Sequence, residues 1–308
     1  MKPRLDLRHL QLIQAIIETG RITDAAEQLG VTPSALSHRL REAERRLDVQ
    51  LFTRVHKRLR RTPAADYMAV VAERILSDLG RAEEDVRRMN AGVQHVVRLA
   101  VEAYSNYRWL PDFVKFLKSR RKGIDLQIMA GARKDPLTSI MNRNIDIAIV
   151  SGEHNQIGLS SVPLFEDPLY FIMPPSHRLA GREFIVGDDI VGEAFITYTK
   201  VPEPDKEFAR LFRPTDTYPK WSTTVELPEA IVELVASGLG TSVLAGWAIQ
   251  TALSEKRIVG AQVTEEGINV PWKAVLRTED MSKEDPNYQV AELLAEWCEQ
   301  SAAGFNTV

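Results

Sequence analysis

The spacing of apolar residues divides the chain into a helical first part and a remainder in which strands and helices alternate. Residues 5–18 predict an amphipathic helix, because apolar side chains recur every three or four positions at Leu7, Leu10, Ile13, Ile16 and Ile17. Gly20 is expected to end this helix. A second, short helix is expected at DAAEQLG, with Thr23 as its cap and Gly30 as its end.

A third helix is expected directly after that turn. Thr32 is its expected N-cap, and Pro33 occupies the first helical position, where the missing N–H group costs nothing. One face of the helix is apolar and consists of Leu36, Leu40, Ala43 and Leu47. The opposite face is hydroxyl-rich and basic and consists of Ser34, Ser37, His38, Arg41 and Arg45. Two helices joined by so short a turn predict a helix-turn-helix over residues 22–41.

Basic residues continue beyond the third helix, in VQLFTRVHKRLRRT. Leu51 and Phe52 are expected to pack inward, and a hairpin or wing is expected to present Arg54, Lys57, Arg58, Arg60 and Arg61. Small hydroxyl side chains near a helix N-terminus can enter a major groove, and arginines on a wing can contact phosphates. Taken singly, each residue fits a solvated surface. The combination within one short segment favours double-stranded DNA as the partner. The candidate contact residues are Thr32, Pro33, Ser34, Ser37, His38, Arg41, Arg54, Lys57, Arg58 and Arg60.

The charge distribution supports the same partner. Residues 1–61 carry 13 Lys and Arg against 7 Asp and Glu, whereas residues 62–308 carry 26 against 35, a balance of −9. A basic head on an acidic body is typical of a protein whose head meets a polyanion.

A long helix is expected next, beginning at the cap-and-proline pair Thr62 and Pro63. Its apolar residues repeat over roughly 27 residues, or about 40 Å at 1.5 Å per residue. They are Tyr67, Val70, Val71, Ile75 and Leu79. Gly80 lies in the helix interior, where it costs about 1 kcal/mol relative to alanine. A long helix with one apolar stripe needs a partner surface, which is either the body of its own chain or a second copy of the helix.

From about residue 94 the pattern changes to apolar blocks that alternate with helical ones. Strands are expected at VVRLAVE, IDLQIMAG, DIAIVSG, AFITYT, STTVEL, TSVLAG, RIVGAQV and VPWKAVLRT. The helices between them include WLPDFVKFLKSRR, EFARLF and PEAIVELVASGLG, and a terminal helix is expected at QVAELLAEWCEQ. This alternation predicts an α/β fold of two units, each with an open parallel sheet covered on both faces.

Ligands bind beyond the carboxyl ends of the strands in open α/β sheets. The residues that follow the predicted strands are therefore candidates for an effector site. They are Tyr104, Ser105, Asn106, Arg133, Ser151, Glu153, Tyr198 and Thr241. Hydroxyl groups and an arginine at helix N-termini suit a small anionic or zwitterionic molecule, although a single serine there is equally a plain helix cap.

Composition disfavours other classes of protein. No run of 18 apolar residues exists, so no membrane span is expected, and MKPRLDLRHLQ lacks the apolar core of a secretion signal, so a cytoplasmic location is expected. Cys298 is the only cysteine, and neither a disulfide framework nor a metal or other cofactor is expected. An enzyme with an accessory basic domain is the main alternative. Against it, the chain has no P-loop, nucleotide-binding glycine motif, HExxH or G-x-S-x-G.

A family resemblance is carried by AAEQLGVTPSALSHRLREAERRLDVQLFTR, which resembles the winged helix-turn-helix of the LysR-type transcriptional regulators over residues 5–65. Ala43 departs from the usual Leu. Asp48 replaces the usual Gly at the helix C-terminus, where Asp tolerates a left-handed conformation better than most residues. DIAIVSG, HRLAG and GLGTSVLAGW resemble the effector-binding domain of the family, a two-lobed fold akin to periplasmic solute-binding proteins.

The resemblance implies a division of the chain and a set of partners. It implies a DNA-binding domain over 5–62, a dimerising linker helix over 63–92 and an effector-binding domain over 93–308. The implied lobes are 93–162 with 269–308, and 163–268. The implied assembly is a homodimer, or a dimer of dimers, on an imperfect palindrome, with RNA polymerase as a further partner. RLAVEAYSNYRWLP is similar to the methionine-biosynthesis activator branch at Glu102, Ser105, Trp109 and Leu110, which implies homocysteine as the effector.

Overall fold

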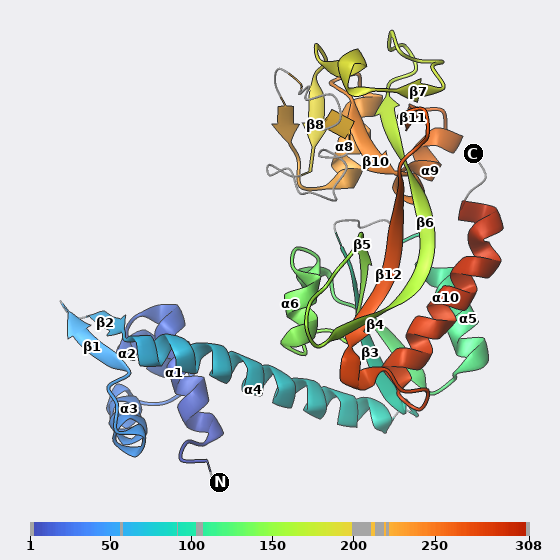
Figure 1. Cartoon of the computed structure of the whole chain (residues 1–308). Helices are drawn as coiled ribbons and strands as arrows, with labels where there is room; N and C mark the ends of the chain where they lie inside the picture. Colours follow the sequence, from blue (N-terminus) through green and yellow to red (C-terminus); the bar gives the residue numbers. More distant parts are fainter. Residues whose placement is uncertain are drawn as a thin grey trace. The chain divides into compact units, whose positions relative to one another are not determined.

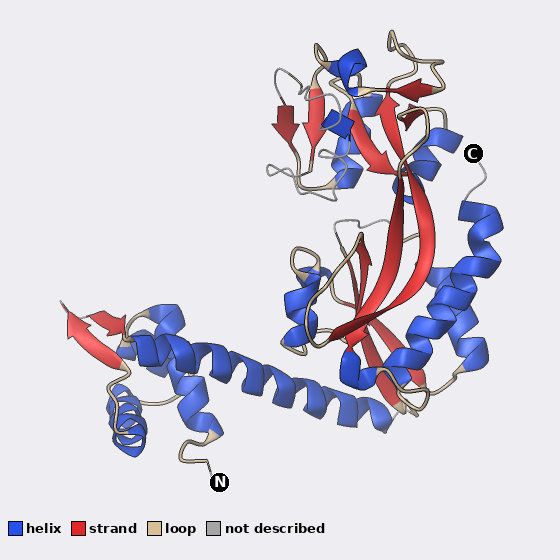
Figure 2. Cartoon of the chain, viewed as in Figure 1, coloured by secondary structure: helices blue, strands red, loops and turns tan. Residues whose placement is uncertain are grey.

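The computed structural model of the chain divides into two compact units, Met1–Ala91 and Gly92–Val308 (Figures 1 and 2). Each unit has its own hydrophobic core. No helix within the described part of the chain is long and apolar enough to cross a membrane. The residues that the structure describes are 3–55, 58–90, 92–102, 107–198, 211–212, 219 and 222–305.

The first unit contains four helices and a hairpin among its described residues. The helices are α1 (Leu7–Thr19), α2 (Ile22–Gln28), α3 (Pro33–Leu47) and α4 (Pro63–Met89), and the hairpin strands are β1 (Phe52–Val55) and β2 (Arg58–Arg61). The helix-turn-helix predicted from the sequence is therefore confirmed as α2 and α3, and the wing as β1 and β2.

The ends of the first three helices follow from local chemistry, with one correction. Gly20 ends α1 at a φ of 71°, and Asp48 ends α3 at a φ of 57°, so Asp48 does adopt the left-handed conformation expected of it. The Thr32 hydroxyl caps α3 by accepting a bond from the backbone N–H of Ala35 at 3.2 Å. The prediction that Thr23 caps the second helix is wrong. The helix begins at Ile22, and the Thr23 hydroxyl instead donates to Asp24.

One glutamate fixes the wing to α3. Glu44 accepts bonds through its Oε1 atom from the backbone N–H groups of Leu51 and Phe52, at 2.9 and 3.2 Å. Leu51 and Phe52 are buried in the same core as Leu36, as expected from the sequence. The wing also bonds to the end of α1, because the N–H group of Leu59 donates to the Gly20 carbonyl at 3.1 Å.

Helix α4 runs unbroken for 27 residues through Gly80. Its first turn is capped by Thr62, whose hydroxyl accepts from the Ala65 N–H group at 3.3 Å. Its apolar side chains lie exposed on this chain at Tyr67, Val70, Ile75, Leu79, Val86 and Met89. We call these six residues the α4 stripe. Val86 is 59% exposed and Met89 53%, so neither is buried in the core of the first unit.

The second unit is a mixed α/β fold built on an eight-stranded sheet. Seven of its strands lie in the order β4-β3-β5-β12-β6-β11-β7, and β10 pairs with β6. Their bounds are β3 (His95–Val101), β4 (Ile124–Ile128), β5 (Ile147–Ser151), β6 (Leu159–Met173), β7 (Phe184–Ile185), β10 (Ser242–Ala245), β11 (Val259–Val263) and β12 (Asn269–Arg277). A separate pair is formed by β8 (Phe195–Thr197) and β9 (Ser222–Thr224).

Two long strands, β6 and β12, run side by side through the unit and join two lobes (Figure 1). Helices lie outside the sheet (Figure 2). They are α5 (Leu110–Arg120), α6 (Pro136–Met141), α8 (Pro228–Ala236), α9 (Gly246–Ser254) and α10 (Pro286–Phe305), with short 3-10 turns at Ala130–Ala132, Gly187–Ile190 and Thr278–Asp280.

The expectation of two separate parallel sheets needs correction. Only β3, β4 and β5 form a parallel group in the first lobe, whereas β12 runs antiparallel to both β5 and β6. The sheet continues from one lobe to the other because β6 is 15 residues long. The helix expected at EFARLF lies almost wholly outside the described residues. The terminal helix is confirmed as α10.

A buried ion network holds the end of β12. The Arg277 side chain is 10% exposed and donates through Nη1 to the carbonyls of Ile140 and Ile145, at 3.4 and 3.1 Å. Its Nη2 atom lies 3.2 Å from Asp146 and 2.7 Å from Asp280. One guanidinium therefore ties the end of α6 and the residues just before β5 to the turn after β12.

Candidate functional site

The exposed face of α3 is the first candidate site. Ser34, His38, Arg41 and Arg45 are exposed, and Ser37 is half-buried. Leu36, Leu40 and Ala43 are buried on the other side of the helix, so packing fixes which face points outward. Pro33 is exposed at the first helical position. The side chain of Thr32 is occupied in capping, which leaves the serines as the uncommitted hydroxyl groups of this end.

The wing provides the second basic surface of the first unit. Arg58 and Arg60 are exposed two positions apart on β2, and Leu59 between them packs against the core. Arg61 lies 3.3 Å from Asp66, so part of its charge is balanced. The backbone of Arg54 lies in β1, but its side chain and the whole of Lys57 lie outside the described part of the chain.

The second candidate site lies at the carboxyl ends of β3, β4 and β5. Ser151 is half-buried, and its N–H group and its hydroxyl both donate to the Glu102 carboxylate at 3.1 Å. Glu153 is exposed and lies 2.7 Å from the Lys273 ammonium, which lowers the pKa of its carboxyl group. Tyr104, Ser105 and Asn106, which follow β3, lie outside the described residues.

Charged groups of the two lobes meet near this edge. Burial raises the pKa of the Tyr107 hydroxyl, and the charges of Arg133 in the first lobe and Glu229 in the second both act on it. Beside them the Lys134 ammonium lies 2.8 Å from the Glu226 carboxylate. The Lys134–Glu226 ion pair therefore joins the two lobes here, and Arg133, Tyr107 and Glu229 lie near enough for their charges to act on one another.

The sequence patterns did not identify Tyr107 and Glu229 as candidate site residues. Tyr107 lies several positions after its strand, and Glu229 lies in the first turn of α8, in the other lobe. No local spacing links them to Arg133. Of the remaining candidates, Tyr198 is half-buried against the main core. Thr241 is buried, and its hydroxyl donates to the Ala194 carbonyl at 3.3 Å, which favours a structural role.

The lone cysteine does not suit nucleophilic chemistry. Cys298 is buried in α10, and burial raises the pKa of its thiol to about 12. The thiolate is the reactive form, so such a side chain is inert at neutral pH. Among the described residues, no group of three or more His, Cys, Asp or Glu side chains is arranged to hold a metal ion.

Two family models match the chain. Residues 7–66 match the bacterial regulatory helix-turn-helix protein model of the lysR family, and residues 90–302 match the LysR substrate binding domain. The second match alone spans more than half of the chain. The chain therefore belongs to the LysR family of bacterial transcriptional regulators.

Within that family the chain is similar to proteins named MetR. The HTH-type transcriptional regulator MetR of Haemophilus influenzae is 31% identical over 284 residues, which are 92% of this chain and 91% of that protein. The regulatory domain of MetR from N. meningitidis is 30% identical, with a TM-score of 0.55, over 68% of this chain and 94% of that one. These relatives are transcriptional regulators and not enzymes.

A full-length structure shares the fold. The LysR-type regulator CbnR, solved in complex with its target DNA, has a TM-score of 0.72 over 96% of this chain and 100% of that chain. At 21% identity this likeness concerns the fold alone.

Proposed function

We propose that this regulator binds a specific double-stranded DNA sequence as a homodimer or a dimer of dimers. The N-terminal end of α3 enters the major groove, where Ser34, Ser37 and His38 contact base edges or phosphates. The wing contacts the flanking phosphates through Arg54, Lys57, Arg58 and Arg60, and Arg41 on α3 adds a further cation. The observation that carries the proposal is the exposed hydroxyl-rich and basic face of a capped helix whose other face is buried.

The proposed dimer uses α4 and recognises an imperfect palindrome. The α4 stripe is the apolar surface that two antiparallel copies of the helix would cover. The proposed division of the chain is residues 5–62, 63–92 and 93–308, with the first lobe over 93–162 and 269–308 and the second lobe over 163–268. RNA polymerase is the further proposed partner, recruited to the DNA that the regulator binds.

The first prediction separates base contacts from phosphate contacts on a DNA sequence selected by the protein. Arg58→Ala is expected to weaken binding to all sequences and to lower the slope of log K against log salt by about 1, because one phosphate contact is lost. Ser34→Ala is expected to leave that slope unchanged and to reduce discrimination between the selected and a scrambled site by about 1 kcal/mol. Fluorescence anisotropy over a series of salt concentrations measures both quantities. Equal losses on both DNAs for both variants would contradict the assignment.

We further propose that a small zwitterion binds between the lobes of the second unit. Arg133 and the Tyr107 hydroxyl would receive its carboxylate, and Glu229 would receive its ammonium group. Tyr104, Ser105, Asn106, Ser151, Glu153, Tyr198 and Thr241 remain proposed residues of the same site. Homocysteine is the proposed effector. The similarity to MetR proteins and the paired charges of the two lobes support this choice.

The proposed mechanism is a shift between two conformations of the dimer. An effector that contacts both lobes stabilises the closed state and changes the spacing of the two DNA-binding heads. Such a shift requires a difference in affinity for the two states, typically about 1 to 3 kcal/mol.

The second prediction concerns this effector. Homocysteine at about 100 times its dissociation constant is expected to stabilise the full chain by about 2.7 kcal/mol, seen as a rise in Tm. Arg133→Gln is expected to abolish most of the rise. Arg143→Gln removes an exposed arginine that is paired with Glu279, and it should leave the rise intact. A screen should include other amino acids, organic acids and aromatic acids. If homocysteine fails and another acid raises Tm, the effector identity is wrong, while DNA binding is untouched.

A further inference from the structure

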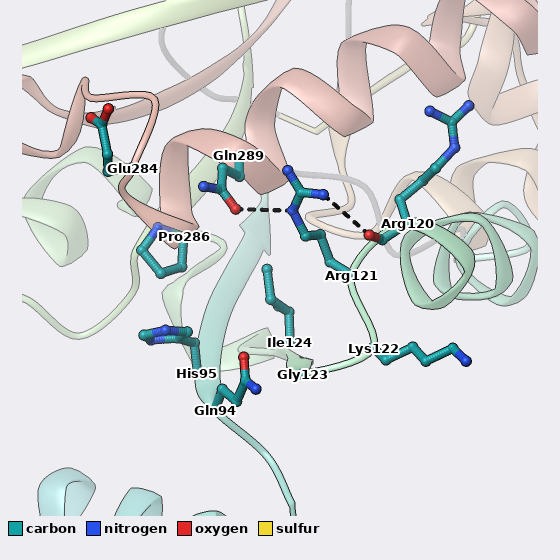
Figure 3. Close-up of a pocket in the computed structure, with 10 residues that line it drawn as sticks. All are labelled: Gln94, His95, Arg120, Arg121, Lys122, Gly123, Ile124, Glu284, Pro286 and Gln289. Atoms are coloured by element: carbon teal, nitrogen blue, oxygen red, sulfur yellow. Dashed lines mark hydrogen bonds between the residues drawn. The ribbon is translucent and has the colours of Figure 1, made fainter.

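A hollow lies at the edge of the first lobe opposite the proposed effector site. It is bounded by the end of α5, the starts of β3 and β4, and the start of α10, and has a volume of about 550 Å³ (Figure 3). His95 and Ile124 begin two parallel strands, so the hollow lies at the amino ends of the strands whose carboxyl ends form the effector site. A volume of a few hundred Å³ is typical of sites for small molecules.

The lining of the hollow is basic, although the body of the chain is acidic. The consecutive residues Arg120, Arg121 and Lys122 line it, and Glu284 is the one acidic residue among the described lining. Basic side chains near a helix C-terminus complement the helix dipole, which accounts for Lys118 and Arg120 in the last turn of α5. The helix dipole does not explain the position of the Arg121 side chain.

Two hydrogen bonds hold the Arg121 side chain, and one of its nitrogen atoms remains available as a donor. Its Nε donates to the Gln289 side chain of α10 at 3.1 Å, and its Nη1 donates to the Arg120 carbonyl at 3.2 Å (Figure 3). Its Nη2 has no acceptor within the described ranges. The neighbouring guanidinium of Arg120 instead pairs with Glu296 at 2.9 Å and lies over the Phe116 ring. A guanidinium held by two bonds loses little entropy when it binds an anion.

A glycine shapes the floor of the hollow. The Gly123 carbonyl accepts bonds from the N–H groups of Gln94 and His95, at 2.8 and 3.1 Å. A Cβ atom at residue 123 would lie 2.6 Å from the Gln94 side-chain oxygen, so the glycine allows Gln94 to lie across it. The side chains of Gln94 and His95 make no hydrogen bond to any residue that the structure describes. Both line the hollow, on the other side of Ile124 from the Arg121 guanidinium in the view of Figure 3.

We propose that this hollow, the Arg121 pocket, binds a small oxyanion such as a phosphate ester or a polycarboxylate. Arg121 supplies a charged donor, which forms stronger hydrogen bonds with an oxyanion than a neutral donor does. Gln94 and His95 supply further donors. The ligand is compact rather than a nucleic acid, because the acidic body around the pocket repels a long polyanion. The pocket is thus a second ligand site, at the other end of the strands from the effector.

Titration calorimetry on the full chain tests this proposal. Pyrophosphate and citrate are the two probes, and ionic strength is held constant with chloride because screening alone weakens any charge contact. At least one probe is expected to bind saturably at one site per chain. Binding of pyrophosphate alone would indicate a phosphate ligand, and binding of citrate alone a carboxylate. The absence of saturable binding by both would overturn the proposal.

Three variants and one matched control locate the binding. Arg121→Gln is expected to weaken binding about tenfold, the value of one lost charge-assisted hydrogen bond. Glu284→Gln is expected to strengthen it about threefold, because it removes the one negative charge of the lining. Lys118→Gln removes one positive charge, as Arg121→Gln does, from the last turn of α5 and outside the pocket, and it should change nothing.

Two results would contradict the location. If Lys118→Gln weakened binding as much as Arg121→Gln, the affinity would come from diffuse surface charge. Because Arg121 also bonds to Gln289, His95→Ala serves as a second variant, one that removes no hydrogen bond to the described residues. It is expected to weaken binding severalfold with Tm unchanged. Unchanged affinity in His95→Ala, together with a lowered Tm in Arg121→Gln, would overturn the assignment.

Discussion

A chain carrying both Leu79→Glu and Val86→Glu is expected to be monomeric and to bind its selected DNA at least about 100-fold more weakly than the native chain, because two linked heads gain that much from effective concentration. Both residues lie on the α4 stripe, and Val86 is 59% exposed within the chain. A carboxylate buried between two apolar helices costs far more than the exposed apolar side chain that it replaces. Neither residue contacts the helix-turn-helix core, so the head itself should stay folded.

Sedimentation at micromolar concentration measures the assembly, and anisotropy measures the affinity. The matched control is Leu79→Met with Val86→Ile, which keeps the stripe apolar and should keep the dimer. A double-glutamate chain that remained dimeric would show that another surface holds the assembly together. A monomer with undiminished DNA affinity would contradict recognition by two heads.

Arg277→Ala is expected to lower the free energy of unfolding of the second unit by about 3 to 5 kcal/mol, the usual cost of removing one member of a buried ion network. The substitution leaves Asp146 and Asp280 without their buried cation and two carbonyls without their donor. Arg143→Ala is the control. Arg143 pairs with Glu279 at the surface, where both side chains are more than half exposed, so its loss should cost less than about 1 kcal/mol. Urea unfolding of the full chain, followed by tryptophan fluorescence, compares the two.

The cost of Arg277→Ala should shrink as the pH falls. Burial raises the pKa of Asp280 above its ordinary value of 3.8, while Arg277 opposes the shift. Without Arg277 the folded-state pKa of Asp280 rises further. A carboxyl group whose pKa is higher in the folded state than in the unfolded state contributes stability at low pH, where it is protonated, and this stability is lost as the pH rises through the folded-state pKa. The variant therefore regains stability relative to the native chain as the solution is acidified towards that pKa. A cost that did not depend on pH would show that packing, and not charge, sets the effect.

The first unit could be predicted almost residue by residue because its signals are local. A cap followed by proline, a glycine stop and a period of three to four residues each act within one helix turn. Thr32, Gly20 and Asp48 therefore behave as their positions predict. The error at Thr23 has the same origin, since a hydroxyl near a helix start bonds equally well to a neighbouring side chain.

The second unit was predictable as α/β but not in its sheet order. Strand β6 mixes exposed, half-buried and buried positions along most of its length and is continuously buried only over its last three residues, so no single period marks it. The antiparallel pairing of β6 with β12 joins residues about a hundred positions apart, which local patterns do not encode. For the same reason Glu229, on the second lobe, and the Arg277 network escaped prediction. The Arg121 pocket likewise depends on a contact between Arg121 and Gln289 that only the fold creates.

Sequence-specific DNA binding by a dimer is tested most directly by selecting binding sites from random DNA with the purified full chain. The salt concentration is held constant throughout the selection. We expect enrichment of an imperfect palindrome whose half-sites are about 10 base pairs apart, or a multiple of that distance. This spacing follows because two heads must meet successive major grooves on one side of the duplex. A pool with no enriched sequence, or with a single half-site and no symmetric partner, would contradict it.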